Sequence, residues 1–144
     1  KLVLILFLKL SRRLLMNKNK KAGTAHESFI VNLFKDKGFE AKRIAEGGSY
    51  DEGDVEVIIN NTKWVIEAKA KSTLNIQATL NKARLKAESV NKIKTPVAII
   101  WKRLVRVDGY KVRQPVANER IVICLSLDDY FSLIDNKYNN NNAE

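Results

Sequence analysis

The first clear hydrophobic pattern along the chain has helical spacing. Its apolar positions, three and four residues apart, are Phe29, Ile30, Leu33 and Phe34. Thr24 and Glu27 have the spacing of a capping box, in which the threonine is the N-cap and the glutamate side chain reaches back to the backbone. Gly38 is the kind of residue that ends a helix. We therefore expect an amphipathic helix between Thr24 and Gly38.

Short runs rich in β-branched and aromatic residues follow, separated by turn signals. The segments expected to be strands are 39–44, 54–59, 64–70, 97–101 and 121–125, with a short pair, 104–107 and 110–112, around an Asp108-Gly109 turn. Asn60-Asn61 separates the second strand from the third and indicates a hairpin. The three glycines between Ala45 and Gly53 indicate a flexible loop before that hairpin.

A second helix is expected between the third and fourth strands, with Ser72 or Thr73 as its cap and an end before Pro96. Its apolar stripe consists of Ile76, Leu80, Ala83, Ala87 and Val90. Ser126 is the expected cap of a closing helix. The order of a helix, three strands, a helix, strands and a final helix predicts an α/β fold, in which helices flank a mixed central β-sheet.

The two ends of the chain depart from this pattern. Leu2–Leu8 is an unbroken apolar run, but it is too short for a transmembrane helix and lacks a small-residue cleavage site after it. Because Met16 is the only methionine, we expect residues 1–15 to be a non-native or upstream extension, with a short membrane-surface helix as the alternative. Residues 16–136 then form one cytoplasmic domain without a membrane-bound part. The asparagine-rich residues 137–144 are expected to be disordered.

Composition and charge narrow the possible chemistry. The 144 residues include one cysteine, Cys124, and one histidine, His26, which excludes a disulfide framework, a Cys/His zinc site and most histidine-based catalysis. The net charge of +10 indicates an anionic partner. Residues 1–21 hold seven basic side chains and no acid, and residues 82–120 hold eleven against three acids. A basic half facing an acidic cluster suits a metal-dependent enzyme acting on nucleic acid, although many solvated surfaces have the same charges.

The predicted hairpin brings two carboxylates together. With a two-residue loop at Asn60-Asn61, Asp54 stands directly opposite Glu67, with Cβ atoms roughly 4.5–5.5 Å apart. Carboxylates at that separation raise each other's pKa or hold a cation, and ligands made only of oxygen favour Mg²⁺ or Mn²⁺. Lys69 follows Glu67 by two residues and shares its face of the strand. Its ammonium can orient an attacking water, help to deprotonate it, or stabilise charge on a scissile phosphate.

Each of these residues also has a purely structural interpretation. Glu27 can be only the capping-box glutamate. Glu67 and Lys69 can form a plain surface ion pair, and Asp54 can be a turn residue. Their joint arrangement favours a shared function, because an acid on a leading helix, a glycine-rich loop, an acid at a strand start and a Glu-x-Lys pair rarely combine by chance.

The same residues carry a family resemblance. The pattern resembles the PD-(D/E)xK nuclease superfamily through Glu27, Gly53-Asp54 and Glu67-Ala68-Lys69. Within that superfamily it is similar to the archaeal-type Holliday junction resolvases through residues 23–27, Arg43, Gly47-Gly48-Ser49 and residues 65–69. The resemblance covers about residues 22–104. Gly53 stands where many members have proline, a departure that costs backbone rigidity but no ligand.

The resemblance implies a metal-dependent phosphodiesterase with a restriction-endonuclease-like core. It implies that Asp54, Glu67 and the backbone carbonyl of Ala68 hold Mg²⁺. Glu27 would ligate the metal directly or through water, and Lys69 would handle the nucleophilic water. The loop serine, Ser49, would assist. Such an enzyme would be a homodimer, because a four-way DNA junction is two-fold symmetric and needs paired cuts.

A further group of polar side chains is expected to contact DNA. Its members are Arg43, Lys71, Gln77, Lys82, Lys86, Lys102 and Arg103. His26 is expected at the surface or against DNA, and Trp64 and Trp101 are expected in the core. Three functions stay open: a Mg²⁺-dependent endonuclease for branched DNA, a related nuclease with another DNA substrate, and a non-catalytic nucleic-acid-binding protein.

Overall fold

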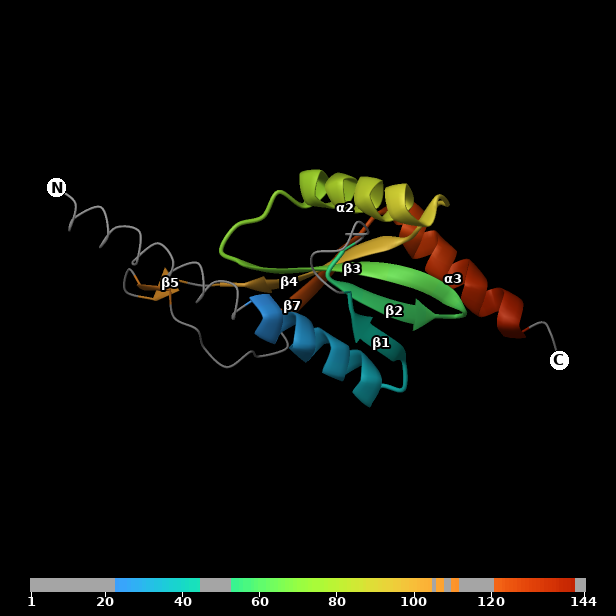
Figure 1. The fold of residues 1–144 in the computed structure, drawn as a ribbon, viewed down its shortest axis with the longest axis horizontal. Coiled ribbons are helices and arrows are strands. Elements are labelled where there is room, and N and C mark those ends of the chain that lie inside the picture. Colours follow the sequence, from blue (N-terminus) through green and yellow to red (C-terminus); the bar gives the residue numbers. More distant parts are fainter. Residues whose placement is uncertain (1–22, 45–52, 105, 108–109, 112–120, 142–144) are drawn as a thin grey trace.

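A five-stranded mixed sheet forms the centre of the protein (Figure 1). The computed structural model describes residues 23–44, 53–104, 106–107, 110–111 and 121–141. In spatial order the strands are β1 (Glu40–Arg43), β2 (Val55–Ile59), β3 (Thr62–Lys71), β4 (Val97–Arg103) and β7 (Ile121–Leu125). β3 and β4 run parallel, and the other neighbouring pairs are antiparallel. The mixed sheet expected from the sequence is therefore confirmed.

All five strands of this sheet form where the hydrophobic pattern predicted them, and β7 matches to the residue. The short pair also forms, as β5 (Arg106–Val107) and β6 (Tyr110–Lys111) in a separate ribbon. Four predicted features lie outside the described residues. They are the extension over 1–15, the loop before Gly53, the Asp108-Gly109 turn and the last residues, 142–144.

The turn between β2 and β3 sets the register of the hairpin. Asn60 and Asn61 have φ angles of 50° and 59°, the left-handed conformation that a tight two-residue hairpin turn requires. Ile59 consequently pairs with Thr62, as predicted, and the ladder continues without a slip. It ends with Val55 opposite Ile66, so Asp54 and Glu67 follow one residue beyond the last pair.

The first helix includes residues 23–36, and Gly38 ends it with a φ of 86°, as expected. The predicted N-cap at Thr24 is wrong, because Gly23 is already helical and the amide of Thr24 lies inside the helix. Its buried face is also rotated from the predicted one. Ile30 and Val31 are buried, whereas Phe29 is 37% exposed.

The second helix, α2 (Ile76–Asn91), begins later than predicted. Its N-cap is Asn75, whose side-chain oxygen accepts a hydrogen bond from the backbone N–H of Ala78 at 3.0 Å. Ser72 and Thr73 are not the cap, because β3 continues to Lys71 and the chain needs the following residues to reach α2. Lys92 ends the helix in a left-handed conformation, φ 58°.

The last helix, α3 (Leu127–Asn141), is capped by Ser126 as predicted. The hydroxyl of Ser126 accepts from the backbone N–H of Asp129 at 3.2 Å. The helix continues to Asn141 and so includes residues 137–141, which the sequence placed in a disordered tail. Each residue added to an established helix gains a backbone hydrogen bond, which offsets the weak helix preference of asparagine.

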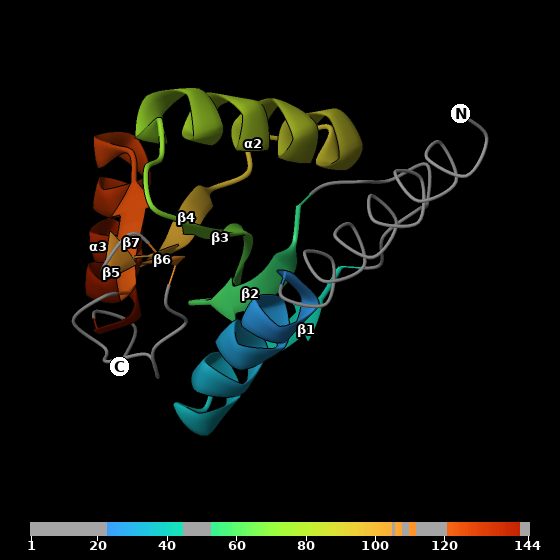
Figure 2. The same ribbon diagram turned by 90° about the vertical axis from the view of Figure 1, so that its left-hand side faces the viewer.

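The helices cover both faces of the sheet (Figure 2). α2 lies on one face, the helix of residues 23–36 lies on the other, and α3 lies next to β7. Two buried apolar clusters result. The α2 side contains Val65, Leu80, Ala83, Ala87, Val97 and Ile99. The other side contains Ile30, Val31, Ala41, Val55, Val57, Trp64, Ile66, Ala98 and Ile100.

A buried ion pair ties α2 to α3. The guanidinium of Arg84 donates to Asp129 at 2.6 Å, and the same carboxylate oxygen accepts from the backbone N–H of Val97 at 3.4 Å. Asp129 is only 2% exposed, so loss of one partner would leave a buried, unpaired charge. No helix among the described residues is long and apolar enough to cross a membrane.

Gly53 packs against β3 without space for a side chain, because a Cβ built there would overlap Cγ1 of Val65. We expect Gly53→Ala to lower the free energy of unfolding by about 1–3 kcal/mol, the usual range for overpacking, as measured by urea denaturation. Gly23→Ala is the matched control, since nothing lies within 4 Å of the added methyl group there. Equal losses in the two variants would contradict the steric explanation.

Candidate functional site

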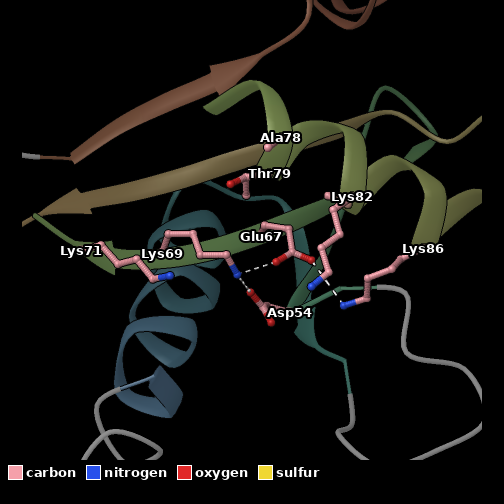
Figure 3. A pocket seen from close by; sticks show the side chains of 9 residues that line it. Asp54, Glu67, Lys69, Lys71, Ala78, Thr79, Lys82 and Lys86 are labelled. Carbon is pink, nitrogen blue, oxygen red and sulfur yellow. Dashed lines mark hydrogen bonds and ion pairs between the residues drawn. The ribbon is translucent and has the colours of Figure 1, made fainter. Parts of the chain in front are cut away.

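A pocket of about 410 Å³ lies between β3 and α2 (Figure 3). Its lining residues are Asp54, Glu67, Lys69, Lys71, Ala78, Thr79, Lys82, Ala83 and Lys86. The β3 residues share one face because strand side chains alternate, and the α2 residues share another because their positions are three or four apart. The pocket therefore joins the Glu-x-Lys pair to the lysines of the second helix.

Asp54, Glu67 and Lys69 meet at the floor of this pocket, as the hairpin register predicted. The ammonium Nζ of Lys69 donates to Oε2 of Glu67 at 2.6 Å and lies 3.6 Å from Oδ2 of Asp54. The backbone N–H of Ala68 donates to the same Oδ2 at 2.7 Å. The N–H and C=O of a strand residue point toward the same neighbour, so the carbonyl of Ala68 also faces the Asp54 side.

The other oxygen of Glu67 is unusual. Oε1 is buried and accepts no hydrogen bond. The ammonium of Lys86 on α2 lies 3.7 Å from this oxygen, a distance that allows an ion pair but exceeds a hydrogen bond. A buried acceptor without a hydrogen bond is costly and commonly marks a functional position.

Burial raises the pKa of Asp54 above its usual value, and the negative charge of Glu67 raises it further. The positive charge of Lys69 and the N–H of Ala68 act in the opposite direction and only partly compensate. The carboxyl group of Asp54 is thus held where its ionised form is disfavoured. A divalent cation beside it would favour the ionised form.

Burial by itself lowers the pKa of Lys69. Its hydrogen bond to Glu67 and the charges of Glu67 and Asp54 outweigh that effect, so the pKa lies above the usual value for lysine. Lys69 is therefore an ammonium at neutral pH. As an ammonium it can stabilise negative charge or orient a water.

Glu27 does not join this cluster. Its Oε2 accepts two hydrogen bonds from the guanidinium of Arg43, at 2.9 Å and 2.7 Å. The capping-box interpretation of Glu27 is therefore wrong, because the side chain turns toward β1. Its negative charge still reaches Asp54 and adds a small part to the rise in the Asp54 pKa.

Even without Glu27, the carboxylates of the pocket suit a divalent cation. Among the described residues no group of three or more acids, histidines or cysteines gathers as a metal cluster. Mg²⁺, however, is usually held by one or two carboxylates, with water and substrate phosphate completing its shell. Asp54 and Glu67 provide two carboxylates, and Oε1 of Glu67, which accepts no hydrogen bond, is a suitable oxygen donor.

The expected DNA-contacting residues are divided between different surfaces. Lys71, Lys82 and Lys86 line the pocket. Successive residues of a strand point to opposite faces of the sheet. On β4, the residue before Lys102 lies on the face that α2 covers, so Lys102 lies on the other face, near His26. Arg103, at the end of β4, is exposed.

Two other expected contacts are engaged within the protein. Gln77 is exposed and donates to Asn81 at 3.0 Å, and Arg43 is bound to Glu27. Ser49 lies outside the described residues.

His26 is not at the surface, in contrast to the expectation from the sequence. It is 7% exposed, and its Nε2 lies 3.4 Å from the carbonyl oxygen of Ile100. Burial lowers the pKa of His26, which favours the neutral ring. Trp64 is in the core as expected, and Trp101 packs on the α2-side cluster while its indole N–H donates to the carbonyl of Lys71 at 2.9 Å.

Sequence reasoning missed the contact between Lys86 and Glu67, as well as the part of Thr79 in the pocket wall. The spacing of Thr79, Lys82 and Lys86 at positions i, i+3 and i+7 could have shown that one face of α2 looks toward β3. Comparison of the chain with protein-family models and with curated proteins finds no match. The geometry of the pocket is therefore the main basis for assigning a function.

Removing the charge of Asp54 should stabilise the metal-free protein at neutral pH. A carboxyl group with a raised folded-state pKa contributes its stability while protonated and loses it as pH rises through that pKa. Asp54→Asn should therefore raise the free energy of unfolding by about 0.2–1 kcal/mol at neutral pH. The gain should vanish below the ordinary aspartate pKa of about 3.9. Urea denaturation across the acidic range, with a chelator present, measures it.

Glu56→Gln, two residues further along and inside β2, is the matched control. Glu56 pairs with Lys42 at 3.2 Å and Lys63 at 3.3 Å, so removal of its charge should give no gain at neutral pH. A gain for Asp54→Asn that stayed constant at all pH values would point to packing and not to charge.

Proposed function

We propose that this chain is a Mg²⁺-dependent endonuclease that hydrolyses phosphodiester bonds in branched DNA, in the manner of a Holliday junction resolvase. One observation carries the proposal: a buried glutamate with an oxygen that accepts no hydrogen bond lies beside a second carboxylate and a lysine in a lysine-lined pocket. The two neighbouring carboxylates repel each other when no metal is present. A divalent cation between them and a phosphate beside the lysines would replace that repulsion with attraction.

Asp54, Glu67 and the carbonyl of Ala68 would hold Mg²⁺, with Mn²⁺ as a substitute of the same oxygen preference. When bound, the cation supplies Lewis-acid polarisation of a phosphoryl oxygen and lowers the pKa of a bound water. Glu27 contributes through its charge and by holding Arg43 at the end of β1. Ser49 keeps the assisting role that the resemblance implies.

Lys69 would stabilise the reaction electrostatically. Its ammonium is held by Glu67 and faces Asp54, so it points at the place where a phosphate would meet the two carboxylates. As an ammonium it would offset the negative charge that develops on the scissile phosphate.

The α2 wall would bind the DNA backbone. Lys82 and Lys86 lie one turn apart on this wall, and Lys71 lines the pocket on the β3 side. Each phosphate contact contributes modestly, and their sum makes binding depend strongly on salt concentration. The order of elements from the first helix to β4 agrees with the proposed restriction-endonuclease-like core. Action on a two-fold symmetric junction implies a homodimer.

A non-catalytic nucleic-acid-binding protein is the second candidate. It is favoured by the two lysines that already neutralise Glu67, since a carboxylate saturated by ammonium groups can be purely structural. The dependence of activity on metal separates the two candidates. A related nuclease with a different DNA substrate would be recognised by the ranking of substrates in the same assay.

The wild-type protein should cut a labelled four-way junction with Mg²⁺ and leave it intact with a chelator. Asp54→Asn and Glu67→Gln should abolish cleavage, because each removes a metal ligand, while DNA binding stays equal or becomes tighter as negative charge is lost. Gel analysis of cleavage and fluorescence anisotropy of binding measure the two effects. A linear duplex of the same sequence is the substrate control.

Absence of cleavage by the wild type under every condition would favour the binding protein. Mg²⁺-dependent cutting that persists in both variants would show that the carboxylates are wrongly assigned.

Lys69→Ala should slow the bond-breaking step by about 10²-fold or more, the usual scale for a positioned charge-stabilising group. Lys82→Ala is the control from the same pocket. It should weaken DNA binding and reduce the salt dependence by about one unit of slope, with little effect on the rate at saturating protein. Single-turnover rates separate the two. If Lys69→Ala cuts as fast as the wild type at saturation, Lys69 has no role in the chemistry.

A further inference from the structure

Glu67 is contacted by two lysines, one on each oxygen (Figure 3). Lys69 makes a hydrogen bond of 2.6 Å to Oε2 from the same strand. Lys86 reaches Oε1 from α2 and stays 3.7 Å away, so that oxygen has a positive neighbour but no hydrogen bond. The Lys86 contact is the weaker of the two.

The burial of Glu67 explains why a second positive charge is present. The glutamate side chain is 8% exposed, and a carboxylate at that depth is strongly destabilising unless its charge is compensated. The Lys86 side chain is 29% exposed. Its flexible four-carbon stem can therefore move the ammonium away from Oε1 without disturbing the packing of α2.

We propose that Lys86 is a displaceable counter-cation that couples the binding of a divalent cation to the binding of a DNA phosphate. This inference rests on the proposed function. A divalent cation on Oε1 would repel an ammonium 3.7 Å from that oxygen, so the two cannot share it at low cost. Displaced from Glu67, the ammonium of Lys86 stays on the pocket wall beside Lys82, where a backbone phosphate can bind it.

The coupling has two consequences. Without a divalent cation, Lys86 is engaged by Glu67 and adds little to DNA affinity. With the cation bound, Lys86 becomes a phosphate contact, so each ligand strengthens the binding of the other by the same factor. Lys82 lines the same wall without an ion pair to Glu67 among the described residues, and it should contribute to DNA binding equally in both states.

The first measurement is Mg²⁺ binding to the protein without DNA, by isothermal titration calorimetry. Lys86→Gln should bind Mg²⁺ at least about five-fold more tightly than the wild type, the lower end of coupling between linked sites. Lys82→Gln removes the same charge from the same wall and should change Mg²⁺ affinity clearly less. Lys86→Arg keeps the charge and should resemble the wild type.

The second measurement is the affinity for a labelled four-way junction with phosphorothioate linkages that slow hydrolysis, with and without Mg²⁺. Lys86→Gln should lose most of the Mg²⁺-dependent gain in DNA affinity while its metal-free affinity changes little. Lys82→Gln should weaken binding by a similar factor in both conditions.

Glu67→Gln distinguishes failure of this inference from failure of the proposed function. If Glu67→Gln abolishes Mg²⁺ binding but Lys86→Gln and Lys82→Gln have equal Mg²⁺ affinities, the metal site stands and the role of Lys86 is overturned. If Mg²⁺ binding survives in Glu67→Gln, the proposed site and the role of Lys86 both fall.

Discussion

The register of the β2–β3 hairpin is the constraint on which the site depends. Side chains alternate between the two faces of a sheet, so a slip of one residue would move Glu67 and Lys69 from the α2 side to the opposite side. Asn60 and Asn61 prevent that slip, since both adopt the left-handed conformation of a two-residue turn. The same register places Asp54 next to Glu67, just after the last pair of the ladder.

The charges of the site follow from placing acids on a buried face. Asp54 and Glu67 lose contact with water there, and their mutual repulsion adds to the cost. Lys69 and Lys86 compensate part of it, and the raised pKa values of Asp54 and Lys69 arise from the same cluster. Such a cluster is poorly explained by stability alone, because well-packed apolar side chains are often at least as stabilising as a buried ion pair.

The position of α2 gives the pocket its second wall. The parallel pairing of β3 with β4 requires a crossover, and α2 is that crossover. The small side chains Ala83 and Ala87 are buried against the sheet and bring the helix close to it, while Arg84 holds it to α3 through Asp129. Lysines on the adjacent face of α2 are thereby aimed at the carboxylates of the hairpin.

The sequence by itself determined the order of elements, the strand positions, the hairpin register and the meeting of Asp54, Glu67 and Lys69. These features follow from local periodicity and turn chemistry, which act within one segment or between two adjoining strands. Only the tertiary structure decided that Glu27 binds Arg43, that His26 is buried against β4, and which lysines reach the pocket. Those contacts join segments distant in sequence, and their partners depend on how helices pack across the sheet, which no local pattern specifies.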